Sequence, residues 1–401
     1  MPKVKLKDVV MRVKEKVDKD DTDLEYYVGG EHIDGNEICV SRRGVIQGST
    51  IGPAFHMAFK AGDVLLMSRN PHLRKASMVD FDGICSDVSY ICRTKDESVL
   101  LQSFLPFLMQ TNDFWRFAEE NKKGGLPFFL NWSDFERYEF ELPPIEKQRE
   151  LSQLLWAMQR TKQAYQNLLA KSDELVKSQF IELFGDSISN SKSLPIKQLS
   201  ELASSRLGKM LDAKKQTGKH RHPYLANFNV QWFYFDFSTL NQMDFDEADQ
   251  IEFSLENGDL MVCEGGEVGR CAIWRGEIKH CYFQKAVHRV RCNIRQVLPE
   301  YLAWWFKFHS DYNGFADIVG SKATIAHLPG VKLKKLEIPV PNIEDQERFV
   351  RFIEQLDKSK FNLQIAIYRA VRRSSSKQQR ATRCTTVRAY PVFDIRLSWL
   401  G

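Results

Sequence analysis

The sequence predicts an α+β protein in which two globular domains alternate with two long helices. The stretch Glu139–Gln148 returns as Glu337–Gln346, with identical residues at five positions and one constant spacing between the copies. A long stretch with heptad-like apolar spacing follows each copy. Short apolar or alternating segments, bounded by glycine, aspartate or asparagine, precede each copy and are typical of strands. These three observations indicate an internal duplication.

The first long helix is expected to begin at Ile145 and to run to about Glu182. A proline just ahead of its start favours an extended entry, and an acidic first turn complements the helix dipole. At a rise of ~1.5 Å per residue such a helix would be ~55 Å long, which is the length of a spacer or an association seam. The predicted seam positions are Leu151, Leu154, Met158 and Leu168 in the first helix and Phe352, Leu356 and Leu363 in the second.

The repeat extends beyond the helices, because Gly62–Leu66 resembles Gly258–Val262. Strands are expected at Asp63–Met67, Ser89–Arg93, Asp259–Cys263 and Ala286–Cys292, and short helices at Val99–Thr111 and Pro299–Phe308. The expected organisation is a globular domain over 1–142, a central helix over 143–186, a second globular domain over 187–340, a distal helix over 341–372 and a basic, poorly ordered tail over 373–401.

Composition allows two or more domains, each with its own core, because the chain has 401 residues and a 43% hydrophobic content. The formal net charge of +5 neither predicts nor excludes a nucleic-acid partner. The start of the chain lacks the apolar core of a signal peptide, and no run approaches the ~18 apolar residues of a membrane span. The eight cysteines contain no Cys-x-x-Cys pair, so we expect reduced thiols in a cytoplasmic protein without a metal site.

Arginine, lysine, histidine and tyrosine side chains gather in the loops, where α+β domains usually carry their binding residues. Arginine and lysine suit phosphate contacts, while arginine reads guanine and glutamine or asparagine reads adenine in the major groove. Because the strands repeat and the loops do not, the two domains are expected to read different targets. For any single residue a solvated polar surface is the alternative.

The candidate DNA contacts form one set in each domain. The first domain supplies Arg69, Asn70, His72, Arg74, Lys75, Lys122 and Lys123. The second supplies His220, Arg221, Tyr224, Gln284, Lys285, His288, Arg289, Lys322 and Thr324.

Catalytic motifs are not convincing in this sequence. Asn70–Leu73 lacks the second proline and the aromatic residue of an amino-methyltransferase motif, and Gly265–Gly269 is too short and acidic for a nucleotide-binding glycine loop. There is no nucleophile elbow and no His-Glu-x-x-His spacing. We therefore predict no catalytic residues and no metal ligands.

The combination of features resembles the specificity subunit of a type I restriction-modification system over roughly residues 1–370. The residues that carry the resemblance are Pro143–Gln148, its copy Pro341–Gln346, and Phe180–Asp186 at the end of the first helix. The chain departs from the family after Ala370, where a basic tail replaces the apolar seam. The second helix is therefore expected to be shorter than the first.

The resemblance implies that the globular parts are target recognition domains, each of which reads half of a bipartite site in double-stranded DNA. It implies that the two long helices form an antiparallel coiled coil that sets the spacing and docks two methyltransferase subunits. Restriction/translocase subunits complete such a complex. S-adenosylmethionine, ATP and Mg would then belong to partner subunits, with no cofactor on this chain. The alternatives are a non-catalytic assembly scaffold with inert loops and a stand-alone DNA methyltransferase.

Overall fold

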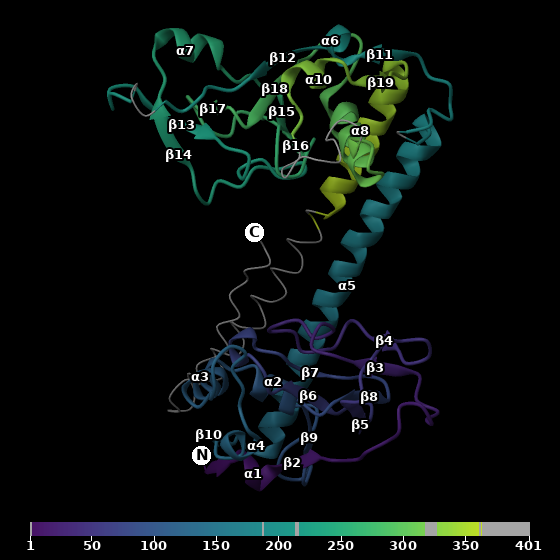
Figure 1. The fold of residues 1–401 in the computed structure, drawn as a ribbon, viewed down its shortest axis with the longest axis vertical. Helices are drawn as coiled ribbons and strands as arrows, with labels where there is room; N and C mark the ends of the chain where they lie inside the picture. The colour runs from purple at the N-terminus through teal and green to yellow at the C-terminus, as the bar shows by residue number, and fades with distance from the viewer. Residues whose placement is uncertain (1, 187, 213–215, 317–326, 361, 363–401) are drawn as a thin grey trace. The chain divides into compact units, whose positions relative to one another are not determined.

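The computed structural model describes residues 2–186, 188–212, 216–316, 327–360 and 362 (Figure 1). The chain divides into two compact units, with unit 1 ending at Gln166 and unit 2 beginning at Asn167. The mixed α and β content agrees with the predicted class. Within the described ranges, no helix has both the length and the apolar character needed to cross a bilayer.

Unit 1 contains two four-stranded sheets. The first has the order β2-β9-β6-β7 and the second the order β4-β3-β8-β5. The strands of the first sheet are β2 (Val10–Val13), β9 (Ser89–Thr94), β6 (Val64–Met67) and β7 (Ala76–Met78). Those of the second are β4 (Gly44–Val45), β3 (Tyr26–Val28), β8 (Gly83–Ser86) and β5 (Phe55–Phe59). All four residues of β6 are buried, as expected for a central apolar strand.

Short helices and one further strand pair complete unit 1. Its remaining elements are α1 (Leu6–Val9), the 3-10 turn η1 (Pro71–Leu73), α2 (Leu105–Met109), α3 (Asn112–Glu120), α4 (Trp132–Phe135), and the antiparallel pair β1 (Lys3–Lys5) and β10 (Glu139–Glu141). Helix α2 packs against β7. The Thr111 side chain accepts a hydrogen bond from the Phe114 amide and so caps α3.

Unit 2 repeats this arrangement with the orders β12-β18-β15-β16 and β14-β13-β17. Its strands are β11 (Ile196–Gln198), β12 (Ala203–Leu207), β13 (Arg221–Leu225), β14 (Asn241–Asp244), β15 (Leu260–Cys263), β16 (Cys271–Ile273), β17 (Tyr282–Phe283), β18 (Val287–Cys292) and β19 (Glu337–Pro339). Its helices are α6 (Leu199–Leu202), α7 (Glu247–Glu252), α8 (Pro299–Asp311) and α10 (Gly330–Lys334). Figure 1 shows α8 beside β16, against which it packs.

Long helix α5 (Ile145–Phe184) has 40 residues and contributes to both units. A second helix covers residues 343–360. Both start at the repeated proline motif, as predicted. Leu363 and the predicted tail over 373–401 lie outside the described residues.

The repeated glutamine of the motif has a role that the sequence did not reveal. The buried Gln148 side chain accepts from the Leu101 amide (3.0 Å) and donates to the carbonyls of Val99 and Pro143, both at 2.8 Å. It therefore joins the start of α5 to the turn before α2. Because this side chain is buried and bonds to both segments, the glutamine helps to fix the entry angle of the helix.

The copy of this glutamine makes the same three contacts in unit 2. Gln346 accepts from the Leu298 amide at 2.8 Å and donates to the carbonyls of Gln296 (3.0 Å) and Pro341 (2.9 Å). Both glutamines are fully buried. In the sequence, the recurrence of Gln148 as Gln346 was the signal that could have predicted this shared role. We call each buried glutamine with its three hydrogen bonds the glutamine lock.

An ion pair between a buried aspartate and a half-buried arginine also recurs on the central strands. In unit 1, Arg93 donates to both oxygens of Asp63 at 2.7 and 2.8 Å. In unit 2, Arg291 donates to both oxygens of Asp259 at the same two distances. These hydrogen bonds raise the pKa of each arginine above its ordinary value. The bidentate geometry ties the glycine turn ahead of each inner strand to the neighbouring strand.

Most strand predictions are confirmed, whereas the predicted helix Val99–Thr111 is wrong in extent. Only Leu105–Met109 forms α2, and α3 follows separately. The reason is the Gln102 side chain, whose Oε1 accepts from the Thr94 amide (2.8 Å) and whose Nε2 donates to the Gly62 carbonyl (2.7 Å). These contacts hold residues before α2 in a turn.

Candidate nucleic-acid interface

The loop after β6 in unit 1 is a tightly constrained turn. Asn70 and Arg74 both have φ of 52° and stand on either side of η1. Such left-handed conformations are costly for residues other than glycine and persist where surrounding contacts enforce them. Arg69 and His72 are exposed on this turn. The loop therefore presents a cation and an imidazole from a fixed backbone.

Two of the predicted contacts in this loop also support its shape. Arg74 Nη1 donates to Asn112 Oδ1 at 3.0 Å, which ties the loop to α3. Lys75 Nζ donates to the Gly30 carbonyl at 2.5 Å. The Asn70 Oδ1 atom is buried and makes no hydrogen bond with the described residues. Arg69 and His72 are consequently the residues best placed for a ligand here.

The second predicted cluster of unit 1 lies directly beside the first. The Asn70 amide donates to the Phe128 carbonyl at 2.8 Å, and the Leu130 amide donates to the Ser68 carbonyl at 2.9 Å. Lys122 pairs with Glu119 at 2.7 Å, and Lys123 pairs with the buried Asp134 at 2.8 Å. The structure thus brings both clusters to one surface.

The corresponding loop of unit 2 has the opposite charge. Residues 264–270, which follow β15, include Glu264 and Glu267, and Arg270 is tied inward by a hydrogen bond from Nη2 to the Asn227 carbonyl at 2.8 Å. The Leu328 amide donates to the Glu264 carbonyl, as Leu130 does to Ser68 in unit 1. Lys322 and Thr324 lie outside the described residues.

Basic residues of unit 2 lie instead around β13 and the turn after β17. His220, Arg221 and Lys285 are exposed, and Gln284 is half-buried. The Gln284 amide donates to the Leu225 carbonyl at 3.0 Å, so this turn is anchored on β13. Gln284 and Lys285 thus lie at the end of β13, whereas His220 and Arg221 lie at its start.

Arg289 is less available than predicted. Its Nη1 donates to the carbonyls of Ser254 and Glu252, the latter at 3.3 Å, and its guanidinium lies 5.7 Å from the Phe283 ring centroid. Burial lowers the pKa of Arg289 from its ordinary value. The residue holds the segment after α7 to β18.

The placement of His288 and Tyr224 does not fit a DNA contact, because both side chains are buried. His288 Nε2 lies 3.0 Å from the Leu328 carbonyl, and burial lowers its pKa. In unit 1, Tyr90 Oη donates to the Leu130 carbonyl at the same distance. Polarity misled the prediction here, because His288 in unit 2 and Tyr90 in unit 1 each contact an equivalent leucine carbonyl in the interior.

The predicted docking positions divide between packed and exposed sites. Leu151 packs against the core of unit 1, and Phe352 and Leu356 pack against the core of unit 2. Leu154 and Met158 are half-buried. Leu168 on α5 is 44% exposed, which leaves apolar surface in the middle of the helix.

Thiol and metal chemistry find no support in the described residues. The cysteines there are free, and burial raises the pKa of Cys85 to about 12 and that of Cys39 to about 11. Such thiols remain protonated at neutral pH. No three His, Cys, Asp or Glu side chains in the described ranges converge as metal ligands would.

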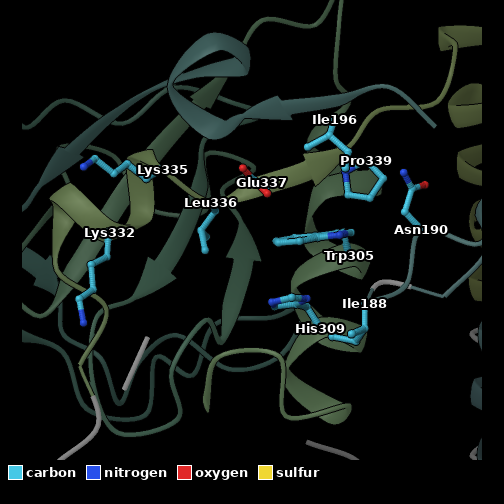
Figure 2. Close-up of a pocket in the computed structure, with 10 residues that line it drawn as sticks. All are labelled: Ile188, Asn190, Ile196, Trp305, His309, Lys332, Lys335, Leu336, Glu337 and Pro339. Atoms are coloured by element: carbon cyan, nitrogen blue, oxygen red, sulfur yellow. The ribbon is translucent and has the colours of Figure 1, made fainter. Parts of the chain in front are cut away.

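A pocket of about 450 Å³ lies in unit 2 between α8, α10 and β19 (Figure 2). Trp305 and His309 stack there with ring centroids 4.5 Å apart. Its lining includes none of the predicted DNA contacts. The pocket is therefore separate from the basic surface around β13.

Part of the chain matches the model of a known family. Residues 192–372 match the model of the type I restriction modification DNA specificity domain. A comparison with curated proteins finds no match. Among solved structures, the type I restriction-modification system S subunit from M. genitalium is similar, with 14% identity, a TM-score of 0.58 and coverage of 93% of this chain and 94% of that chain.

Two further solved chains resemble this one more loosely. One comes from a structure on complex assembly and conformational transition of the type I R-M system, with 17% identity, a TM-score of 0.47 and 95% coverage of both chains. The other is the HsdS subunit from Thermoanaerobacter tengcongensis, with 16% identity, a TM-score of 0.37 and 91% coverage of both. Residues 192–372 are thus similar to the type I restriction modification DNA specificity domain, and the fold of the whole chain is similar to that of the M. genitalium S subunit.

Proposed function

We propose that the chain is the specificity subunit of a type I restriction-modification complex and that each unit reads one half of a bipartite site in double-stranded DNA. In this proposal unit 1 corresponds to the domain predicted over 1–142 and unit 2 to that over 187–340. S-adenosylmethionine, ATP and Mg belong to partner subunits.

The observation that carries the proposal is a common framework with different loops. The two larger sheets have corresponding strand orders, and the bidentate arginine–aspartate pair recurs between equivalent strands. The loop after the inner strand is basic in unit 1 and acidic in unit 2, whereas the exposed cations of unit 2 lie around β13. A scaffold with inert loops has no need for two such different surfaces on one framework.

The exposed cations divide into two proposed roles. Arg69 and Arg221 can each make a bidentate hydrogen bond to a guanine edge or to a phosphate, because a guanidinium offers paired donors. Lys285 offers a point charge suited to phosphate. Gln284, half-buried beside Lys285, can pair with adenine.

Helix α5 and the helix over 343–360 are proposed to set the spacing of the half-sites and to dock methyltransferase subunits. With 40 residues, α5 is ~60 Å long. That length exceeds the ~34 Å of one DNA turn. Leu168 and Leu175, which are 44% and 49% exposed, supply apolar surface for a partner.

Mapping methylated adenines tests the proposal. The full chain is expressed with a type I methyltransferase subunit in a host that lacks its own DNA methylation, and the genome is sequenced for modified bases. We expect methylation at two short sequences separated by a fixed gap. Absence of methylation with a competent methyltransferase would favour the scaffold, and S-adenosylmethionine binding by the isolated chain would favour the stand-alone enzyme.

A further inference from the structure

The segment 122–130 of unit 1 is a closed loop with an apolar tip. The Lys123 amide donates to the Phe129 carbonyl at 2.8 Å, and the Phe129 amide donates back to the Lys123 carbonyl at 3.0 Å. Leu126, at the far end, is 84% exposed, and Pro127 beside it is also exposed. The loop therefore has a hydrogen-bonded base and a bare apolar end.

The base of this loop is fixed from several sides. Gly124 has φ of 82°, and a Cβ there would lie 2.8 Å from the Phe129 ring, so only glycine fits both the conformation and the space. Lys122 Nζ lies 4.5 Å from the centroid of the Phe128 ring. Lys123 is held by the buried carboxylate of Asp134. These contacts leave the tip as the part that projects.

A single exposed leucine is ordinary on a protein surface. What distinguishes Leu126 is its setting between cations. Arg69, which is exposed, forms a backbone bridge with Phe129 at the base of the loop, and Lys123 is 53% exposed at its side chain. A projecting apolar tip between cations matches the chemistry of a duplex, in which apolar base faces lie between two charged backbones.

We propose that Leu126, with Pro127, is a wedge that enters a base step of the bound duplex while Lys123 contacts a flanking phosphate and Arg69 contacts the adjacent base edge. This inference rests on the proposed DNA-reading function. Apolar wedges of this kind partly unstack a step and bend the duplex. Pyrimidine–purine steps unstack most easily, so the half-site read by unit 1 should contain or adjoin such a step.

The experiment uses the full chain with its methyltransferase partner and a duplex that carries the mapped target. 2-Aminopurine is placed at successive positions, because its fluorescence rises when a base unstacks. We expect a rise at one step of the unit 1 half-site. Leu126→Ala should abolish that rise and weaken binding about tenfold, since it removes a few buried methyl and methylene groups. The salt dependence of binding should not change, because no charge is lost.

Ile251→Ala is the matched control. Ile251 is 79% exposed, but it lies on α7 among Glu247, Asp249 and Glu252, whose charge disfavours DNA. This variant should bind and unstack DNA as the unmodified chain does. Leu126→Met, which keeps the apolar bulk, should retain most of the fluorescence rise.

The outcomes separate the wedge from the broader proposal. If the unmodified complex fails to bind the duplex, the DNA-reading function falls and the wedge with it. If the complex binds the duplex without a rise in 2-aminopurine fluorescence at any position, this result overturns the wedge alone. The same conclusion follows if Leu126→Ala changes neither the fluorescence nor the affinity. Weaker binding of Leu126→Ala with an unchanged fluorescence rise would also contradict the wedge, because the loss of insertion should lower both the fluorescence and the affinity.

Discussion

Units 1 and 2 keep the same internal framework while their surfaces differ. Each unit has a bidentate arginine–aspartate pair and a buried glutamine lock at the start of a helix. Where the loop after β6 in unit 1 has the cations Arg69, Arg74 and Lys75, the equivalent loop of unit 2 has Glu264 and Glu267. The residues that stabilise each unit are therefore separate from the exposed residues proposed to contact DNA, so each set can be altered alone.

The largest expected effect is on the recurrent ion pair. Asp63→Ala and Asp259→Ala should each lower the free energy of unfolding of their own unit by about 3 kcal/mol, because two charge-assisted hydrogen bonds to a half-buried arginine are lost. Chemical denaturation of the full chain, with hydrogen exchange to assign the unit, measures this. The control is Glu256→Ala, which removes the 63% exposed partner of Arg291 and should cost less than about 1 kcal/mol. Equal losses in variant and control would refute the shared framework role.

The glutamine lock should show the next largest effect. Gln148→Ala and Gln346→Ala each leave one amide and two carbonyls without their partner, so we expect a loss of about 2 kcal/mol in either unit. Hydrogen exchange should rise at the start of the following helix. A loss in one unit only would show that the two locks are not equivalent.

Swapping the residue types at His288 and Tyr90 should transfer a pH dependence of folding stability from unit 2 to unit 1. Burial lowers the pKa of His288 in the folded chain, so the unfolded chain binds the proton first as the pH falls below about 6.5. Unit 2 should therefore lose stability below that pH, by at most about 1.4 kcal/mol per pH unit for one proton.

The matched variants are His288→Tyr, which should remove this dependence, and Tyr90→His, which should introduce it into unit 1. Hydrogen exchange of β18 and β9, corrected for the intrinsic pH dependence of exchange, reports each unit. An acid-labile unit 2 in His288→Tyr would assign the effect to another group.

The smallest expected effect is electrostatic. Lys285→Ala should weaken binding of the mapped duplex modestly and reduce the slope of log affinity against log salt by about 1, with no change in sequence preference. Fluorescence anisotropy over a salt series measures the slope. A changed preference at one base pair would mean that Lys285 reads a base rather than a phosphate.

Much of the framework was predictable because apolar periodicity and repeated motifs depend on burial alone. The start of α5, the strand β6 and the helix α8 follow from such patterns. Arg69 and Lys285 stay predictions as DNA contacts, and the structure places both side chains at the surface, as such a contact requires. His288 was misjudged because one histidine looks the same at a surface and beneath a buried carbonyl. The Gln102 contacts that shorten α2 join residues distant in sequence, so local propensity could not predict them.

Each unit is proposed to read its own half of a bipartite site in double-stranded DNA. The most direct test maps methylated sites for the unmodified chain, Arg69→Ala and Arg221→Ala, each expressed with the same methyltransferase subunit. We expect Arg69→Ala to relax positions in one half-site and Arg221→Ala to relax positions in the other, with the gap unchanged in both. A variant that relaxes both halves, or two variants that relax the same half, would contradict this proposal.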